Sequence, residues 1–376
     1  MSLQKKVKKI LITGSDGFIA KNLKARLSEI SNIILLQFSR GQNNEELAEL
    51  ISKADLIFHL AGENRPKKVE DFALNNAQLT KTICEIVKSQ KRKIPIIFSS
   101  STQAVQDNDY GKSKLQAEKH LQIHEKETGS PVHILRLPGI FGKWCKPNYN
   151  SVVATFCYNV VNNFEITISD DNKILTLCYI DDLIDDFLDL IDSNKPYSHN
   201  AKPSITYSIS LKDLYEKIMN FKNSRMTHTL GEVGEGMDRA LYSTYVSYLP
   251  KKDFSYELKS NVDDRGNFVE MLKTKSSGQF SFFTSKPGIT RGVHYHHTKT
   301  EKFLVLKGKA RFRFRSMLTN ETHEIFSDEL NPTVVESIPG WTHDIKNIGD
   351  DIMIVMLWAN EIFDSVKPDT YSAKTF

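Results

Sequence analysis

The sequence predicts two domains of different classes: a doubly wound α/β domain with a parallel sheet at residues 1–250, and an all-β barrel or sandwich at residues 251–376. The length of 376 residues exceeds what one hydrophobic core usually organises. Short apolar runs alternate with helical segments in the first part of the chain. The later part has closely spaced strands that are rich in β-branched and aromatic residues.

The first part contains five short apolar runs that begin at Val7: VKKILITG, NIILLQFS, ADLIFHLAG, IPIIFSS and VHILRLP. Helical segments such as KNLKARLSEI and NAQLTKTICEIVKS separate them. Strands that alternate with helices are joined by right-handed crossovers, and helices then cover both faces of the resulting parallel sheet. These runs therefore predict the doubly wound domain.

The pattern of predicted secondary structure changes after about residue 250. The segments SGQFSFFTSKPG, KFLVLKGKARFRFRS and DIMIVMLWANEIF read as strands that glycine and proline turns interrupt. The stretch 241–258 is aromatic and unlike a linker, so we place the boundary near Pro250.

The composition excludes several classes of function. Lys and Arg number 50 against 46 Asp and Glu, and no long basic run follows the initial KKVKK, so we expect no nucleic acid partner. No signal peptide or membrane-length apolar run is visible, so we expect no membrane association. The four cysteines lack a CxxC spacing, which indicates reduced thiols and a cytoplasmic protein: Cys84, Cys145, Cys157 and Cys178.

A glycine turn follows the first predicted strand, Lys8 to Thr13. Gly14 and Gly17 allow a tight turn and a close approach to a pyrophosphate, which would then lie at the N-terminus of a helix that we expect from about Lys21. After the second strand, a site for NAD usually has an acidic residue that binds the ribose, whereas this chain has Ser39 and Arg40. An arginine there suits a 2′-phosphate, so the sequence favours NADPH.

A hydroxyl, a phenol and an ammonium group follow the fourth predicted strand. Tyr110 and Lys114 are four residues apart and share one helix face, so we expect the ammonium to lower the pKa of the phenol. A serine at the end of the preceding strand, Ser101, can polarise the carbonyl group of a substrate that Tyr110 protonates. These residue types suit proton transfer to a ketone oxygen.

Five strings in order, TGSDGFIA, DLIFHLAG, SSS with YGKSK, LRLPGIFG and CYIDDL, resemble the extended short-chain dehydrogenase/reductase family over roughly residues 7–245. The resemblance implies a Rossmann-type fold, a nicotinamide cofactor, a nucleotide-sugar substrate, and catalysis by Ser101, Tyr110 and Lys114. Ser101 and Tyr110 are closer in sequence than in most members, which leaves Thr102 as an alternative hydroxyl. The implied cofactor-binding residues are Gly14, Gly17, Phe18, Ile19, Ser39, Arg40, Leu60, Ala61, Gly62, Tyr110 and Lys114.

Metal ligands are concentrated in the predicted β domain. His294 and His296 alternate on one strand and therefore face the same side, and Glu301 begins the next segment. His343 follows later, whereas His297 points away if the strand is regular. Three imidazoles and a carboxylate suit Zn, Fe, Mn or Ni and leave positions for a substrate oxygen.

The strings around these ligands, HYHHTKTE and PGWTHDIKN, resemble the two motifs of the cupin family over roughly residues 255–365. The flanking NVDDRGNFVEMLKT and SKPGITRGVHYHHTKTEKFLVLKG are similar to sugar-nucleotide 3,5-epimerases within that family. The resemblance implies removal of a proton α to a 4-keto group. The proline–glycine turn before His343 is more compact than usual.

The two halves together, with FGKWCKPNYNSVVATFCYN and YSTYVSYLP, resemble a family of bifunctional capsular-polysaccharide enzymes along nearly the whole chain. That resemblance implies epimerisation at C3 of a UDP-2-acetamido-2,6-dideoxy-4-keto hexose by the cupin, and then reduction at C4 with NADPH, towards UDP-N-acetyl-L-fucosamine. It also implies zinc and a homodimer.

Three alternatives remain open at the level of sequence. The cupin could be a non-catalytic dimerisation or sugar-binding module, or an iron dioxygenase, and the whole chain could be an NADP sensor, although the last leaves Tyr110 and Lys114 without a role. Candidate uracil contacts are Trp144, Lys146, Asn148 and Arg225.

Overall fold

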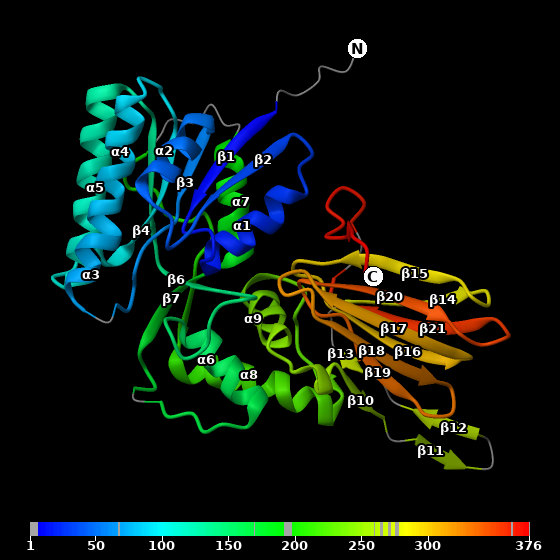
Figure 1. Ribbon diagram of the computed structural model, residues 1–376. Helices are drawn as coiled ribbons and strands as arrows, with labels where there is room; N and C mark the ends of the chain where they lie inside the picture. Colours follow the sequence, from blue (N-terminus) through cyan, green and yellow to red (C-terminus); the bar gives the residue numbers. More distant parts are fainter. Residues whose placement is uncertain are drawn as a thin grey trace. The chain divides into compact units, whose positions relative to one another are not determined.

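The computed structural model describes residues 7–66, 68–168, 170–191, 198–258, 260–263, 266–269, 272–274, 278–361 and 364–375. The chain forms two compact units, coloured by sequence in Figure 1. The first consists of Met1–Ile140, Tyr149–Ser151 and Leu175–Ser208, and the second of Phe141–Asn148, Val152–Ile174 and Ile209–Phe376. The second unit thus includes segments that precede residue 250. The boundary between two functional domains near Pro250 stays a prediction.

The first unit is built on a five-stranded sheet with the order β2-β1-β3-β4-β5, in which every pairing is parallel. This confirms the predicted doubly wound α/β class, and β1 has the bounds that the sequence predicts. The strands are β1 (Lys8–Thr13), β2 (Ile33–Phe38), β3 (Leu56–His59), β4 (Ile96–Ser101) and β5 (Val132–Leu137).

Helices cover both faces of this sheet (Figure 1). One face packs against α2 (Asn44–Lys53), α4 (Leu79–Ser89) and α5 (Asp109–Thr128), whose apolar residues join a core with Leu11 and Ile57. On the other, Phe187 of α7 (Ile180–Ile191) packs against Phe58 with ring centroids 5.2 Å apart. The remaining helical segments are α1 (Phe18–Ser28), α3 (Glu70–Phe72), the π-helix η1 (Ala73–Gln78) and the 3₁₀ helix η2 (Thr102–Val105).

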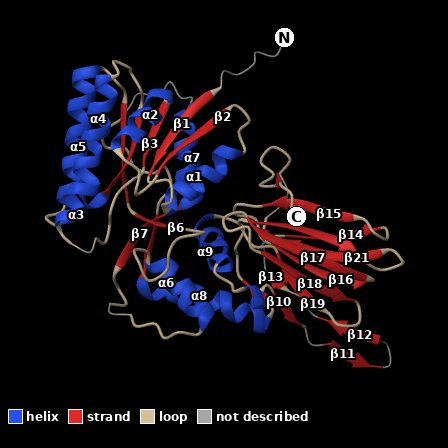
Figure 2. Cartoon of the chain, in the orientation of Figure 1, coloured by secondary structure: helices blue, strands red, loops and turns tan. Residues whose placement is uncertain are grey.

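The second unit contains two five-stranded sheets whose described pairings are all antiparallel, which confirms the predicted all-β part (Figure 2). Their orders are β10-β19-β16-β21-β14 and β18-β17-β20-β15-β22. The strands are β10 (Ser255–Glu257), β14 (Gln279–Ser285), β15 (Thr290–Tyr295), β16 (Glu301–Lys307), β17 (Lys309–Ser316), β18 (Thr322–Asp328), β19 (Thr333–Glu336), β20 (Trp341–Asn347), β21 (Met353–Ala359) and β22 (Tyr371–Ser372).

Apolar side chains connect these two sheets. Phe303 of β16 lies 5.8 Å from Phe312 of β17, measured between ring centroids, and both are buried. Gly308 is the single residue between these two strands, and its φ of +90° suits glycine where the chain passes from one sheet to the other. The epimerase-like segment 261–274 lies partly outside the described residues.

Three helices belong to the same unit: α6 (Val152–Asn162), α8 (Leu211–Thr227) and α9 (Gly236–Ser247). Arg225 of α8 forms an ion pair with Glu336 of β19, and Lys302 of β16 forms a second ion pair with the same carboxylate. Glu336 and Lys302 are buried. This buried charge cluster joins α8 to the first antiparallel sheet.

Shorter elements complete the described structure. Two-stranded pairs are formed by β11 (Ser260–Asp263) with β12 (Gly266–Val269) and by β9 (Thr229–Leu230) with β13 (Lys273–Thr274). A three-stranded sheet has the order β6-β7-β8, with β6 (Gly139–Phe141), β7 (Ile174–Tyr179) and β8 (Tyr207–Ser210). The 3₁₀ helix η3 (Lys251–Asp253) precedes β10.

Candidate active sites

The glycine turn of the first unit lies between β1 and α1. Gly14 has a φ of +66°, and a Cβ there would lie 2.6 Å from the Cα of Ala61, so only glycine fits. Gly17 is the N-cap of α1 and makes no side-chain cap, which leaves the first backbone N–H groups, including those of Phe18 and Ile19, free for an anion. The helix begins at Phe18, earlier than the predicted start near Lys21. This turn fits a cofactor pyrophosphate.

Arg40 follows β2 and already has a partner. Its guanidinium lies 2.5 Å from Oε2 of Glu63, and the side chain of Arg40 is 82% exposed. The other oxygen of Glu63 accepts a hydrogen bond of 3.1 Å from the hydroxyl of Tyr149. The amide of Ser39 donates to Gln42. Arg40 therefore stays available at the surface, but a 2′-phosphate would compete with a carboxylate for it.

The predicted catalytic group is assembled where β4 meets α5. Asn108 caps α5 by accepting a hydrogen bond of 2.7 Å from the amide of Gly111, which places Tyr110 in the first turn. The side chain of Ser101 interacts with the Tyr110 phenol and acts to lower its pKa. Ser101 is buried, whereas the alternative hydroxyl, Thr102, is exposed. The structure thus brings Ser101 and Tyr110 together, and it favours Ser101 over Thr102.

Lys114 lies one turn further along α5. It is buried, donates a hydrogen bond of 2.9 Å to the carbonyl oxygen of Ser99, and burial lowers its pKa to about 8. Burial also raises the pKa of Tyr110, against a smaller opposite effect of the hydrogen bond with Ser101. The expectation that the ammonium lowers the phenol pKa is therefore not met, and the ammonium is directed to a backbone carbonyl.

Gly62 and Asn76 complete this site. A Cβ at Gly62 would lie 2.9 Å from Nζ of Lys114 and 3.0 Å from Oδ1 of Asn76. Asn76 accepts from the amide of Glu63 at 2.8 Å and donates to Oγ of Ser113 at 2.9 Å. Sequence reasoning missed Asn76; it lies in a π-helix, an element frequent at functional sites, which the apolar periodicity does not reveal.

A buried histidine connects β1 with β3 and α4. His59 makes hydrogen-bond contacts of 2.7 Å with Oγ1 of Thr13 and 2.8 Å with Oγ1 of Thr80. Burial, with a smaller contribution from the charge of Lys114, lowers the pKa of His59 to about 3, so its imidazole is neutral. Oγ1 of Thr13 also accepts from the amide of Ala61 at 3.3 Å, which fixes the segment after β3, where Leu60 lies.

The four predicted metal ligands come together in the second unit. His294 lies in β15, His343 in β20 and Glu301 at the start of β16, whereas His296 follows the end of β15. Their ligand atoms all lie within 4.8 Å of one another. The register between β15 and β20 shifts between Gly292 and His294, just before the first ligand, so the alternation of His294 and His296 is preserved. A β-bulge of this kind re-aims a side chain.

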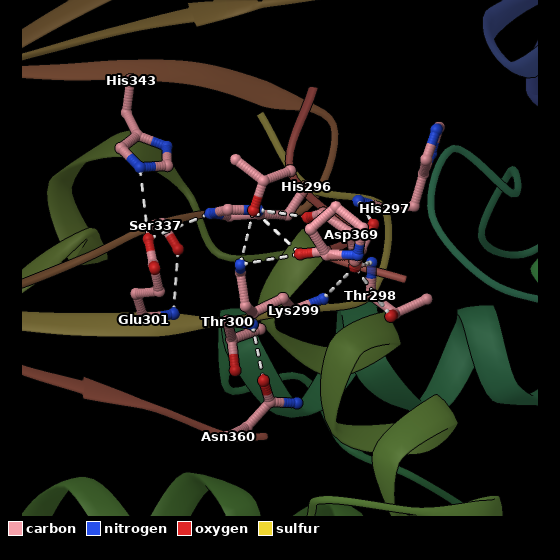
Figure 3. Close-up of polar contacts among 12 residues, drawn as sticks. His296, His297, Thr298, Lys299, Thr300, Glu301, Ser337, His343, Asn360 and Asp369 are labelled. Carbon is pink, nitrogen blue, oxygen red and sulfur yellow. Dashed lines mark hydrogen bonds and ion pairs between the residues drawn. The ribbon is translucent and has the colours of Figure 1, made fainter. Parts of the chain in front are cut away.

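The carboxylate of Glu301 is directed towards His296 and His343 (Figure 3). Its Oε2 is 3.0 Å from Nε2 of His296 and 3.3 Å from Nε2 of His343. The ring of His294 lies 4.7 Å from that of His343 and 4.9 Å from that of His296, measured between centroids. Figure 3 also shows His297 directed away from this group, as the sequence predicts.

The protonation of the group suits a divalent cation. Burial lowers the pKa of His294 to about 3 and lowers that of His343. Burial raises the pKa of Glu301, but the imidazoles of His296 and His343 lower it well below its usual value. Neutral imidazoles and a carboxylate are the forms that bind metals. Nδ1 of His343 is buried without a hydrogen-bond partner among the described residues, and its Nε2 contacts the carboxylate of Glu301, so the donor set fits a metal ion.

The predicted uracil contacts have varied surroundings. Arg225 is engaged with Glu336 and with the carbonyl oxygen of Asp253, so its donors serve the buried charge cluster. Trp144 has a φ of +67° and packs so closely on Gly340 that a Cβ there would lie 2.7 Å from its ring. The amide of Asn148 donates to Thr155. These contacts do not identify a uracil site.

Two family models match the chain. Residues 10–201 match the NAD dependent epimerase/dehydratase family, and residues 261–371 match the Polysaccharide biosynthesis C-terminal domain. The chain is 51% identical to a UDP-2-acetamido-2,6-beta-L-arabino-hexul-4-ose reductase of Pseudomonas aeruginosa, over 97% of this chain and 98% of that protein.

Solved structures give the same picture. The capsular polysaccharide assembling protein CapF of Staphylococcus aureus is 44% identical with a TM-score of 0.67, covering 97% of this chain and 99% of CapF. The UDP-glucuronic acid 4-epimerase of Bacillus cereus with NAD is 20% identical with a TM-score of 0.52, covering 57% of this chain and 84% of that protein. The second likeness concerns the fold alone.

Proposed function

The chain belongs to the NAD dependent epimerase/dehydratase family, together with the Pseudomonas reductase and the Staphylococcus CapF, and from this premise we propose that it is a bifunctional nucleotide-sugar enzyme. The second unit epimerises C3 of a UDP-2-acetamido-2,6-dideoxy-4-keto hexose, and the first unit reduces C4 with NADPH. The product leads to UDP-N-acetyl-L-fucosamine for a capsular polysaccharide. The identity to the reductase carries the proposal, because the shared length includes both sites.

The order of the two steps follows from carbonyl chemistry. A proton at C3 is acidic only while C4 is a ketone, because the negative charge left by its removal is delocalised onto the ketone oxygen. Epimerisation therefore precedes reduction. A divalent metal held by His294, His296, Glu301 and His343 supplies a Lewis acid for that oxygen when it is bound. We propose zinc, which this donor set suits.

The first unit provides proton transfer. NADPH supplies the hydride for C4 when it is bound. Tyr110 donates its phenolic proton to the C4 oxygen, and the hydroxyl of Ser101 donates a hydrogen bond to the same oxygen. Lys114 is buried one helical turn away and is positioned by the carbonyl oxygen of Ser99. Its positive charge balances the negative charge that Tyr110 carries after it donates its proton. Arg40 binds the 2′-phosphate in exchange for Glu63, which is the basis for preferring NADPH to NADH.

Two further properties belong to the same proposal. The four cysteines are free and buried, which fits a cytoplasmic protein with reduced thiols. A homodimer is proposed from the family resemblance and is measured by light scattering of the purified protein. None of the helices in the described part of the chain is long and apolar enough to cross a membrane.

The test is incubation of the purified protein with NADPH and the UDP-linked 4-keto sugar, followed by NADPH absorbance and NMR of the product. We expect NADPH oxidation and a product inverted at C3. The name of the Pseudomonas relative records only a reductase, which favours a second candidate: a reductase whose β unit binds sugar or mediates dimerisation. NADPH oxidation without inversion supports that candidate, and no oxidation rejects both.

A further inference from the structure

We propose that Asp369, near the end of the chain, is the positioning residue that holds His296 in the orientation needed to bind the metal. This inference rests on the proposed metal site of the second unit. Asp369 makes two kinds of contact, one through its backbone carbonyl and one through its carboxylate, and both reach the segment that carries His296 (Figure 3).

The backbone carbonyl of Asp369 fixes the tautomer of His296. Its oxygen lies 2.6 Å from Nδ1 of His296. A carbonyl oxygen can only accept a hydrogen bond, so Nδ1 must carry the proton. In a neutral imidazole the lone pair is then on Nε2, the atom that lies 3.0 Å from Glu301. A hydrogen bond on the outer nitrogen is how ligating histidines are oriented, and it leaves Nε2 directed to Glu301 and to the proposed metal.

The carboxylate of Asp369 fixes the backbone that follows His296. One oxygen accepts from the amide of His297 at 3.0 Å. The other accepts from the amides of Thr298 at 2.8 Å and Lys299 at 2.7 Å, and from the hydroxyl of Thr298 at 2.9 Å. Glu301 follows directly after this segment at the start of β16. One side chain thus sets the path between two ligands.

The backbone conformation of Asp369 suits this double role. Its φ of +37° lies in the left-handed region, where Asp and Asn are the best tolerated residues after glycine. Asparagine at this position preserves the backbone conformation and the size of the side chain. It replaces one of the two acceptor oxygens by an NH₂ group, which cannot accept a hydrogen bond. Either the amide of His297 or the amides of Thr298 and Lys299 then lose their acceptor. Asp369→Asn therefore separates the carboxylate contacts from the shape of the turn.

The rest of the C-terminal segment offers a matched control. Arg315 anchors its end through a hydrogen bond of 3.2 Å to the carbonyl oxygen of Thr375. Strand β22 also pairs with β15 beside His294. Arg315→Gln loosens the end of the segment without touching the loop between His296 and Glu301. It reports what general loosening of the C-terminus does to the site.

The experiment uses the full-length protein, stripped of metal by a chelator. The zinc dissociation constant is measured by competition with a chromophoric chelator, and the ligand field is measured from the visible spectrum of the cobalt(II) form. We expect Asp369→Asn to weaken zinc binding roughly tenfold to a hundredfold and to alter the cobalt spectrum. Arg315→Gln should match the wild type in both, and NADPH binding should stay unchanged in all variants. Asp369→Ala, which removes both acceptor oxygens, should weaken zinc at least as much.

The outcomes distinguish this inference from the proposal on which it rests. A wild-type protein that binds neither zinc nor cobalt(II) contradicts the proposed metal site itself. Metal binding by the wild type with identical constants and spectra for Asp369→Asn overturns the role of Asp369. Equal weakening by Asp369→Asn and Arg315→Gln also overturns it, because the segment then acts only as a tether. Circular dichroism of each variant verifies that the β unit is folded.

Discussion

The two sites of this chain are assembled in opposite ways. In the first unit, the site is built from short segments that follow the strands of one parallel sheet: the turn at Gly14, the residues around Gly62 and the Tyr110–Lys114 pair. Each of these segments is fixed by its own backbone contacts. In the second unit, side chains from different strands converge on Glu301, and a residue from the end of the chain orients one of them. The first site should therefore tolerate changes in distant parts of its unit better than the second.

Replacing the phenol breaks the first site without disturbing its framework, and has the largest expected effect. Tyr110→Phe removes the proton donor, so reduction should fall by roughly two or more orders of magnitude while NADPH still binds. Lys114→Met should be comparably damaging. The measurement is the rate of NADPH oxidation with the keto sugar, alongside cofactor titration. Thr102→Ala is the control, since its exposed hydroxyl is expected to be dispensable. Wild-type reduction by Tyr110→Phe excludes the mechanism.

The buried charge cluster tests how strongly the second unit depends on distant contacts. Glu336→Gln leaves the cations of Lys302 and Arg225 without a carboxylate, which should destabilise the unit by roughly 3–5 kcal/mol. Denaturant unfolding followed by fluorescence measures the change. The control is Glu321→Gln, which breaks a more exposed ion pair with Lys251 and should cost about 0–1 kcal/mol. Equal stability of the two variants contradicts this view of the cluster.

The Arg40–Glu63 pair tests cofactor choice in the first unit. Arg40→Ala should weaken NADPH by roughly 1.5–3 kcal/mol, the range for a hydrogen bond to a charged group, and leave NADH nearly unchanged. Glu63→Gln should strengthen NADPH binding, because the guanidinium no longer has to leave a carboxylate. Fluorescence titration with both cofactors measures this. Equal losses for NADPH and NADH in Arg40→Ala show that Arg40 does not contact the 2′-phosphate.

Acid titration of the first unit should reveal His59. Its folded-state pKa of about 3 lies below the ordinary value of 6.5, so the unfolded chain binds the proton first. The folded state should therefore lose about 1.4 kcal/mol of stability for each pH unit below the ordinary value, until the folded pKa is reached. His59→Gln should flatten that part of the profile of melting temperature against pH. A profile identical to the wild type would mean that the pKa of His59 does not differ between the folded and unfolded states.

Local parts of both sites could be predicted from sequence. The strand Lys8–Thr13, the turn at Gly14 and the four-residue spacing of Tyr110 and Lys114 depend on neighbours along the chain, and so they follow from periodicity and glycine placement. The convergence of the four predicted metal ligands also follows from recognisable spacing. Contacts such as Arg40 with Glu63 could not be predicted, because periodicity does not say which side chain reaches another segment.

Three features needed the structure for a physical reason. Asp369 acts on His296 partly through its backbone carbonyl, 73 residues away in sequence, and a carbonyl leaves no compositional signal. The register shift between Gly292 and His294 lies just before the first predicted ligand, and the regular alternation of the sequence does not reveal it. The raised pKa of Tyr110 depends on burial, which outweighs the opposite effect of Ser101 and which periodicity does not reveal.

We propose that C3 chemistry belongs to the second unit and C4 chemistry to the first, and proton exchange in deuterated water distinguishes the two. Without NADPH, the wild type and Tyr110→Phe should both exchange the C3 proton of the keto sugar for deuterium, as seen by NMR. A variant with His294 and His296 both changed to Gln should lose metal and exchange yet still bind NADPH, with circular dichroism confirming a folded β unit. Exchange at the wild-type rate by that folded, metal-free variant would contradict the account.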